Sequence, residues 1–241
     1  MHPEPPPPRI DPADRLGAFL EILITSGFPT QLLLITALRA AGMSLQTPEG
    51  GLNPRFVFTL SLLDAVLVIA LVVLLLRAHG ESAREVLLGR VRMLKEAFVG
   101  IAMIPLAFLV LVLILGLVLT YAPSLRNVPR NPLEDMLLNR TDTAIFAVVV
   151  LVAGGVREEI QRGFILHRFE RYLGGGAVGV VVHSLLFGAG HLEQGYDAAI
   201  VTATLGAFWG IVYLRRRSIV APMVSHAGFN LAQIIKYVAL R

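Results

Sequence analysis

The segment from residue 97 to residue 122 contains no charged side chain, and its 26 residues are almost all apolar. A helix needs about 20 apolar residues to cross a bilayer, so this segment predicts a membrane-spanning helix. Six further apolar blocks lie at 16–38, 56–76, 143–169, 176–191, 198–214 and 219–237. The sequence therefore predicts an all-α fold, a polytopic transmembrane bundle of about seven spanning helices.

Composition supports a membrane protein and excludes several other classes. Hydrophobic residues make up 55% of the chain and charged residues 16%, whereas about a quarter of a soluble domain is charged. No cysteine is present, which excludes disulfides, thiolate catalysis and zinc held by cysteine. The net charge of +4 is typical of basic membrane loops, so we expect membrane lipids as partners and no nucleic acid.

The loops between the predicted helices differ in charge. Basic residues are frequent at 77–95, 168–171 and 215–217, whereas the loop at 192–197 has none. The positive-inside rule places such basic loops in the cytoplasm together with the N-terminus. We therefore expect an integral protein of the plasma (inner) membrane with a cytoplasmic N-terminus.

Three regions of the chain are expected to differ in structure. Residues 1–15 are rich in proline and predict a disordered N-terminus. Residues 16–142 hold the first spanning helices, with a kink expected at Gly27 and Pro29. Within them, the basic segment 77–95 is amphipathic and is expected along the membrane surface. Residues 143–241 form a helical core that carries three clusters of polar residues at membrane depth.

The first cluster is an acidic pair followed by an arginine. Glu158 and Arg162 are four residues apart, so they share a helix face and can form an ion pair. Glu159 lies about 100° around the helix axis. One carboxylate is then held by arginine, while the other is free to take a proton from water. The alternative interpretation is a charged helix end whose side chains reach the membrane surface.

The second cluster places two histidines and a phenylalanine at helical spacing. His183, Phe187 and His191 recur every four residues and line one face. A single histidine on an apolar helix is usually a hydrogen-bonded packing residue, and two on one face weaken that interpretation. Gly188 and Gly190 predict a close helix approach or a break just before His191.

The third cluster is a histidine and an amide on the last helix. His226 and Asn230 are four residues apart and share a face. Polar side chains of this kind also join membrane helices by hydrogen bonds. Ionisable groups inside a bilayer cost roughly 2.5–3.5 kcal/mol each, so three such clusters together indicate a functional site.

The three clusters resemble the motifs of the CPBP family of intramembrane proteases, which includes the CAAX prenyl proteases. That family has a glutamate pair followed by arginine, then Phe-x-x-x-His, then His-x-x-x-Asn. Phe187 to His191 matches the second motif and His226 to Asn230 the third. The resemblance covers roughly residues 143–233. It implies an intramembrane endopeptidase with a polar cavity inside the bundle.

The resemblance also implies roles for individual residues. A glutamate would activate water as the general base, and His191, His226 and Asn230 would polarise the scissile carbonyl. Three more residues are implied to support them: Arg162, Phe187 and His183. The expected partner is a peptide or protein substrate, with or without a lipid anchor.

The first motif departs from the family pattern by one residue. The family usually has three residues between the glutamate pair and the arginine, and this chain has two. If Arg162 is the anchor, Arg157 occupies the first glutamate position and Glu158 the second. If the pair is the anchor, Glu158 and Glu159 keep their roles. Glu158 is favoured as the base because it stays in phase with Arg162.

A metal-free glutamate mechanism is expected, with zinc as the open alternative. Two histidines and a glutamate can form a three-ligand catalytic zinc site, which here would be His191, His226 and Glu158. No His-Glu-x-x-His helix is present, and these ligands would have to come from three separate helices.

Two other functions stay open from the sequence. The altered first motif is compatible with an inactive scaffold or regulator. A proton-coupled transporter would use Asp64, Glu158, His183 and His191 as a relay. The chain lacks the paired hydropathy halves of many transporters, and Asp64 is expected to be a buried hydrogen-bonding residue that faces the bundle.

Overall fold

The computed structural model describes residues 11–240, and helices dominate that range. The α-helices are α1 (Pro12–Thr25), α2 (Phe28–Ala40), α3 (Pro54–Ala78), α4 (Met93–Tyr121), α5 (Arg140–Val149), α6 (Glu158–Tyr172), α7 (Gly176–Ala189), α8 (Tyr196–Arg216) and α9 (Val220–Ala239). Two π-helical segments, η1 (Arg84–Leu88) and η4 (Val150–Arg157), and three short 3-10 turns, η2 (Pro123–Leu125), η3 (Pro132–Leu137) and η5 (Leu192–Gln194), complete the fold. Since α5, η4 and α6 follow one another without a gap, they form one continuous rod, called here the α5–α6 rod.

The all-α prediction is confirmed, whereas the count of seven spans is not. Within the described residues, four helical segments are long and apolar enough to cross a membrane: α1–α2 taken together, α3, α4 and α8. The α7 helix is apolar but has 14 residues, which is short for a span. The α6 helix carries four charged or polar side chains in its first five residues, so it lacks the composition of a span.

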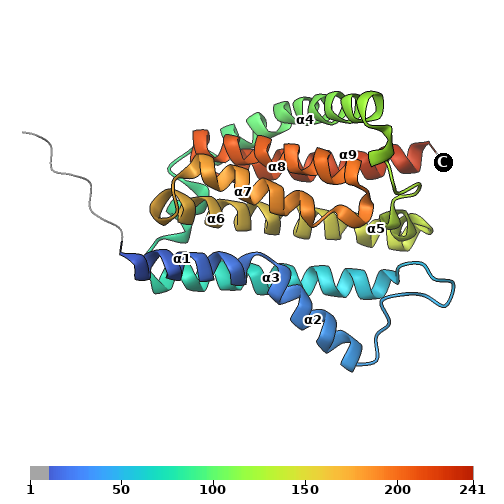
Figure 1. Ribbon diagram of the computed structural model, residues 1–241, viewed down its shortest axis with the longest axis horizontal. Helices are drawn as coiled ribbons and strands as arrows, with labels where there is room; N and C mark the ends of the chain where they lie inside the picture. The colour runs from blue at the N-terminus through green and yellow to red at the C-terminus, as the bar shows by residue number, and fades with distance from the viewer. Residues whose placement is uncertain (1–10, 241) are drawn as a thin grey trace, which may run out of the picture.

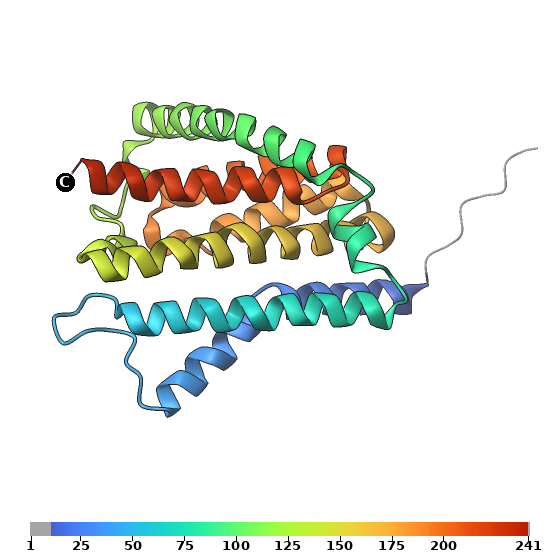
Figure 2. The ribbon, with the colours of Figure 1, turned by 180° about the vertical axis from the view of Figure 1, so that it is seen from behind.

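The helices are arranged in layers, with the α5–α6 rod in the middle. The α3 helix packs on one side of the rod and α9 on the other, while α7 and α8 pack against each other beside it (Figures 1 and 2). The α4 helix lies outermost, against α8 and α9, and exposes a row of large apolar side chains. In a bilayer such a surface faces lipid, so the polar rod is screened by more apolar helices.

The predicted kink in the first apolar block is confirmed. The α1 helix ends at Thr25, Gly27 has a φ of 88°, and α2 begins at Phe28 with Pro29 in its first turn. Beyond this break α2 runs obliquely away from the bundle (Figures 1 and 2). At this break the Thr25 carbonyl oxygen is free to accept a hydrogen bond from Gln161 of the α5–α6 rod.

The expected place of the basic segment 77–95 along the membrane surface stays a prediction, and the structure shows that this segment is not one continuous helix. The α3 helix continues to Ala78, and only the short η1 segment follows before α4. Leu87 in η1 is buried, and its carbonyl accepts a hydrogen bond from the Ile219 backbone N–H at 2.8 Å. Tyr213 Oη donates to the Val86 carbonyl at 3.0 Å. The segment is therefore tied to the α8–α9 corner by contacts that sequence periodicity does not contain.

The predicted disordered N-terminus at 1–15 lies mostly outside the described residues. Inside them, the side chain of Asp11 accepts a hydrogen bond from the Ala13 N–H at 2.9 Å, and Pro12 occupies the first helical turn. This combination is a standard helix start, so α1 begins at Pro12 and not after residue 15.

A close approach of α7 and α8 depends on Gly188. A Cβ atom at this position would lie 2.6 Å from the Ala199 carbonyl oxygen and 2.7 Å from the Ala203 Cβ. Gly190 follows as the C-cap of α7, so the helix ends before His191. Both outcomes expected from these two glycines are confirmed.

Gly188→Val is expected to destabilise the protein by about 1–3 kcal/mol, because the added side chain forces α7 and α8 apart. Thermal unfolding in detergent measures the effect. Gly116→Val is the matched control, since a Cβ at Gly116 on α4 meets nothing within 4 Å. Equal unfolding temperatures for the two variants would contradict the prediction.

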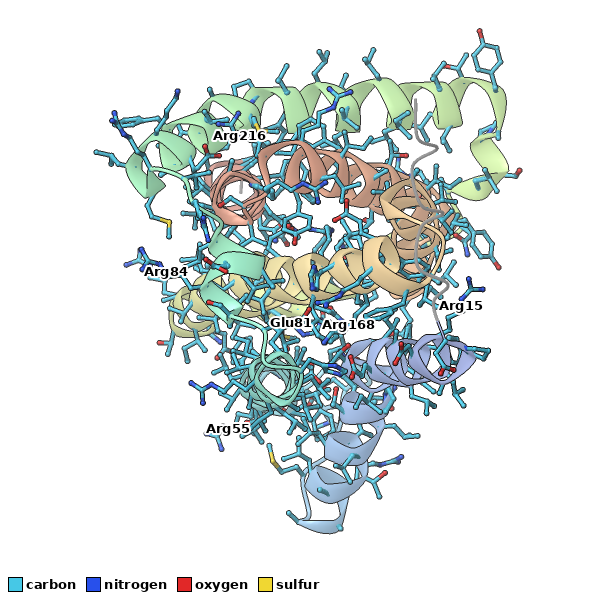
Figure 3. The ribbon with its side chains drawn as sticks, turned by 90° about the vertical axis from the view of Figure 1, so that its left-hand side faces the viewer. Arg15, Arg55, Glu81, Arg84, Arg168 and Arg216 are labelled. Carbon is cyan, nitrogen blue, oxygen red and sulfur yellow. The ribbon has the colours of Figure 1, made fainter. Side chains whose placement is uncertain are left out.

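A cluster of ion pairs closes one end of the bundle. Arg168 of α6 lies between Glu21 of α1, which its Nε contacts at 2.6 Å, and Glu81, which follows α3. His167 Nε2 lies 2.8 Å from Glu81, and Arg171 also pairs with it. Figure 3 views this end and shows Glu81 and Arg168 close together between α6 and the first helices. The cluster fixes α1 and the end of α3 to the α5–α6 rod.

Stability is expected to fall in acid because of Glu81. Burial alone would raise the pKa of this carboxyl, but the contacts with His167 and Arg168 outweigh burial and lower the pKa from 4.5 to about 2. The unfolded chain therefore takes up the proton first as pH falls. The stabilisation from Glu81 is complete above pH 4.5 and is lost as pH falls towards 2. Acid unfolding curves check this, and Glu81→Gln should flatten the dependence in that window.

Candidate active site

The two glutamates of the acidic pair begin α6 and have different environments. Glu159 is buried, with 1% of its side chain exposed, and pairs with Arg162, which is fully buried. Glu158 keeps 20% of its side chain exposed and has no arginine partner within residues 11–240. The expected pairing of Glu158 with Arg162 is therefore wrong. One carboxylate is held and the other is free, but Glu159 is the held one.

The local backbone helps to separate the two carboxylates. The η4 segment immediately before Glu158 is π-helical, which widens the helix and changes the phase of the residues around it. Positions three and four residues apart both lie on one helix face, so the spacing alone allows either glutamate to reach Arg162. The third helix of the site, α9, decides between them.

His226 of α9 lies between the two carboxylates. Its Nδ1 is 2.8 Å from Glu159 Oε1, and its Nε2 is 3.7 Å from Glu158 Oε2. The Trp209 ring stacks on the imidazole with centroids 3.9 Å apart, and Trp209 Nε1 donates to Ser225 Oγ at 3.2 Å. The ring is thus fixed in orientation, with Nδ1 committed to Glu159 and Nε2 facing Glu158.

Two rings of α7 and the ring of His191, just after this helix, form a row that borders the same site. His183 stacks on Phe187 with centroids 6.0 Å apart, and Phe187 meets the His191 ring edge-on at 5.1 Å. Arg162 lies over the Phe187 ring at 4.9 Å. His191 Nδ1 is 2.8 Å from the Phe187 carbonyl oxygen, which can only accept. Nδ1 therefore carries a proton, and the lone pair of the neutral form of this imidazole is on Nε2.

A cavity of about 160 Å³ lies between the α1–α2 break, α6 and α7. Glu158 lines it together with His183, Phe187 and His191. His226 is not in the lining, but it contacts Glu158 from the α9 side. The cavity therefore holds the free carboxylate and the free histidine lone pair in one space.

Asn230 lies one turn beyond His226 on α9 and is outside the cavity lining. A Cβ at Gly154 would come within 2.7 Å of Asn230 Nδ2, so the amide packs directly against the backbone of η4. The predicted common face of His226 and Asn230 is present, since both face the α5–α6 rod. Asn230 is the one expected site residue that the structure places at the edge of the cluster.

Sequence reasoning missed Trp209 and the pairing of Asp64 with Arg157 beside the site. Trp209 stacks on His226 and fixes its orientation. The sequence clue to this role is that the one tryptophan of the chain lies within an apolar helix, whereas tryptophans of membrane proteins are enriched near helix ends. Asp64 of α3 accepts from Arg157 Nη2 at 2.6 Å, and both side chains are buried. The expectation that Asp64 is a buried hydrogen-bonding residue is confirmed. An acidic residue in an otherwise apolar helix indicates that a basic side chain pairs with it, but the sequence does not identify that side chain.

The zinc alternative finds no support in the arrangement of side chains. In the part of the chain that the structure describes, no three His, Cys, Asp or Glu side chains are grouped so that they could hold a metal ion. That holds for the set Glu158, His191 and His226. We therefore assign no chemical step to a metal.

Comparison with known proteins agrees with the motifs. Residues 140–232 match the family model described as Type II CAAX prenyl endopeptidase Rce1-like. Neither the curated proteins nor the solved structures contain a match to the chain. The matched range includes the acidic pair, the α7 ring row and the His226–Asn230 pair, which the fold brings together. Residues 140–232 are therefore similar to the Rce1-like, CAAX-protease family, and the described part of the chain has helices long and apolar enough to cross a membrane.

Proposed function

We propose that this chain is an intramembrane endopeptidase in which Glu158 is the general base. One observation carries the proposal. Of the three carboxylates beside the cavity region, Asp64 and Glu159 each have an arginine partner, and Glu158 has none among the described residues. A carboxylate in a partly enclosed cavity that no arginine holds is available to take a proton from water.

The chemistry follows from the groups around the cavity. A water molecule donates one proton to Glu158, and His191 Nε2 accepts the hydrogen bond from its second hydrogen. The water oxygen attacks the carbonyl carbon of the scissile peptide bond. As the tetrahedral intermediate collapses, the C–N bond breaks and the proton passes from Glu158 to the leaving nitrogen. A free carboxyl end and a free amine result, and Glu158 returns to its starting form.

The oxyanion of the intermediate needs hydrogen-bond donors. His226 is fixed by Glu159 and Trp209 and presents Nε2 towards Glu158, so its N–H is the first donor when the ring is doubly protonated. Asn230, on the same face of α9, extends the donor row for a peptide that lies along this helix.

The cavity surroundings support one class of substrate. Phe28, Val182 and Leu186 line the cavity and expose apolar surface, so the opening faces a hydrophobic environment. A membrane-embedded or membrane-proximal peptide fits this opening. We place the protein in the plasma (inner) membrane, with the Glu81–Arg168 end and the N-terminus in the cytoplasm.

Purified protein in detergent, offered a set of membrane-peptide substrates, tests the proposal. The wild type should cleave at a defined bond, and His226→Ala should lose at least about 100-fold in kcat, as expected for an oxyanion donor. His79→Ala is the matched control, because His79 also contacts a glutamate, Glu21, and neither of these residues lines the cavity. Binding without cleavage would instead indicate a scaffold, and gradient-driven uptake in liposomes a transporter.

A further inference from the structure

Two buried arginines flank Glu158 along the α5–α6 rod, and each has a carboxylate of its own. Arg162 pairs with Glu159 on the same helix. Arg157, directly before Glu158, pairs with Asp64 of α3 through a 2.6 Å contact from Nη2. Asp64 lies outside the segment that matches the family, so a distant helix supplies the partner of a residue next to the base.

The guanidinium of Arg157 is held in a closely fitted site, called here its seat, beside Gly27, Asp64 and Gln161. Its Nη1 donates to Gln161 Oε1 at 3.1 Å, and Gln161 Nε2 donates to the Thr25 carbonyl at 2.6 Å. A Cβ at Gly27 would lie 2.3 Å from Arg157 Nη2, so the seat exists only because residue 27 is glycine. The break between α1 and α2 therefore serves to admit this guanidinium.

Asp64 is itself fixed by the first helices. Thr30 Oγ1 donates to Asp64 Oδ1, and Gln31 Nε2 donates to Oδ2 at 3.5 Å. The carboxylate thus has partners on both oxygens and a defined direction, towards Arg157. The network joins α1, α2 and α3 to the residue that precedes Glu158.

Without Asp64, Glu158 would be the nearest carboxylate on the same helix rod that no other arginine holds, and so the partner left for the Arg157 charge. Arg157 and Glu158 line the same cavity, and Arg157 Nε has no hydrogen-bond partner. An uncompensated buried charge is strongly unfavourable, so the guanidinium would turn to the neighbouring free carboxylate. A Glu158 paired with arginine would be a weaker base.

We propose that Asp64 is a positioning residue of the reaction, which holds the Arg157 guanidinium away from Glu158 and keeps that carboxylate free. The inference rests on the proposed function for its catalytic meaning. Its physical content, the choice of partner by Arg157, does not need proteolysis to be measured.

The experiment compares Asp64→Asn, Asp64→Glu and the double variant Asp64→Asn/Arg157→Gln with the wild type. In Asp64→Asn, kcat should fall by about 100-fold with little change in KM, because the base is occupied and not removed. Asp64→Glu should restore most of the activity. The double variant should be more active than Asp64→Asn, because no guanidinium is left to occupy Glu158. If the residues only stabilise the fold, the double variant will be no better than the single one.

A second readout is independent of activity. Dicyclohexylcarbodiimide modifies protonated carboxyls in apolar surroundings, and mass spectrometry gives the extent of modification at Glu158. Asp64→Asn should reduce this labelling by about tenfold, because arginine favours the ionised form, and the double variant should restore it. Glu96→Gln is the matched control, since it breaks a partly buried ion pair with Arg216, and neither residue lines the cavity. It should leave Glu158 labelling unchanged.

The two readouts separate the possible failures. Unchanged labelling in Asp64→Asn would overturn the positioning role, whatever the protease assay gives. The expected labelling pattern in a wild-type protein that cleaves nothing would overturn the proposed function and keep the charge arrangement. If Asp64→Asn does not fold, Gly27→Ala displaces Arg157 Nη2 while Asp64 stays charged, and its unfolding temperature is measured beside the labelling because the φ of 88° strains an alanine.

Discussion

Glu158→Gln is expected to reduce kcat by about 10²- to 10⁴-fold, the range that general acid–base catalysis contributes. The glutamine keeps the shape of the side chain but cannot take a proton from water. Since Glu158 has no arginine partner and stays partly exposed, the substitution should change the unfolding temperature little. Initial rates of peptide cleavage, together with thermal unfolding of the same sample, measure both effects.

Glu85→Gln serves as the control for removing a carboxylate. Glu85 pairs with Arg90 on the exposed surface of η1, and such pairs contribute about 0–1 kcal/mol. Both its activity and its stability should match the wild type. Retention of activity within about tenfold in Glu158→Gln would mean that another group is the base. Glu159 would then be the first residue to test.

Glu159→Gln is expected to destabilise the protein by about 3–5 kcal/mol, because it leaves the Arg162 charge buried without its partner. The side chain of Arg162 is fully buried, and its Nε and Nη2 already lack hydrogen-bond partners. The Nδ1 of His226 would also face an amide in place of the carboxylate that holds it. The variant should therefore lose both stability and activity, in contrast to Glu158→Gln.

Unfolding in detergent with increasing sodium dodecyl sulfate measures this stability. The double variant Glu159→Gln/Arg162→Met removes both charges, and it should recover much of the lost stability, since well-packed apolar residues often replace a buried pair without loss. A double variant as unstable as the single one would show that the buried charge is not the cause. The two glutamates are therefore distinguished by their substitutions: Glu158→Gln should lower activity alone, whereas Glu159→Gln should lower both stability and activity.

Sequence patterns predicted the helices well because helix formation in a membrane depends on local composition. Each apolar block corresponds to a helical segment with ends within a few residues, and Gly27 with Pro29 marked the one break. The helix end before His191 was equally visible, since Gly188 and Gly190 act through their own lack of a side chain. The motifs also located the site, because clustered ionisable residues in apolar helices are costly wherever they face.

Only the tertiary structure decided which charges pair with which. Spacing on one helix allows Arg162 to reach Glu158 or Glu159, and the choice depends on His226, which α9 brings from 67 residues away in the chain. The partner of Arg157 comes from α3, which is 93 residues distant, through a seat formed by the α1–α2 break. Periodicity reports what one helix presents on each face. The electrostatics of a buried carboxylate depend on what the neighbouring helices place opposite, and that information is in the packing alone.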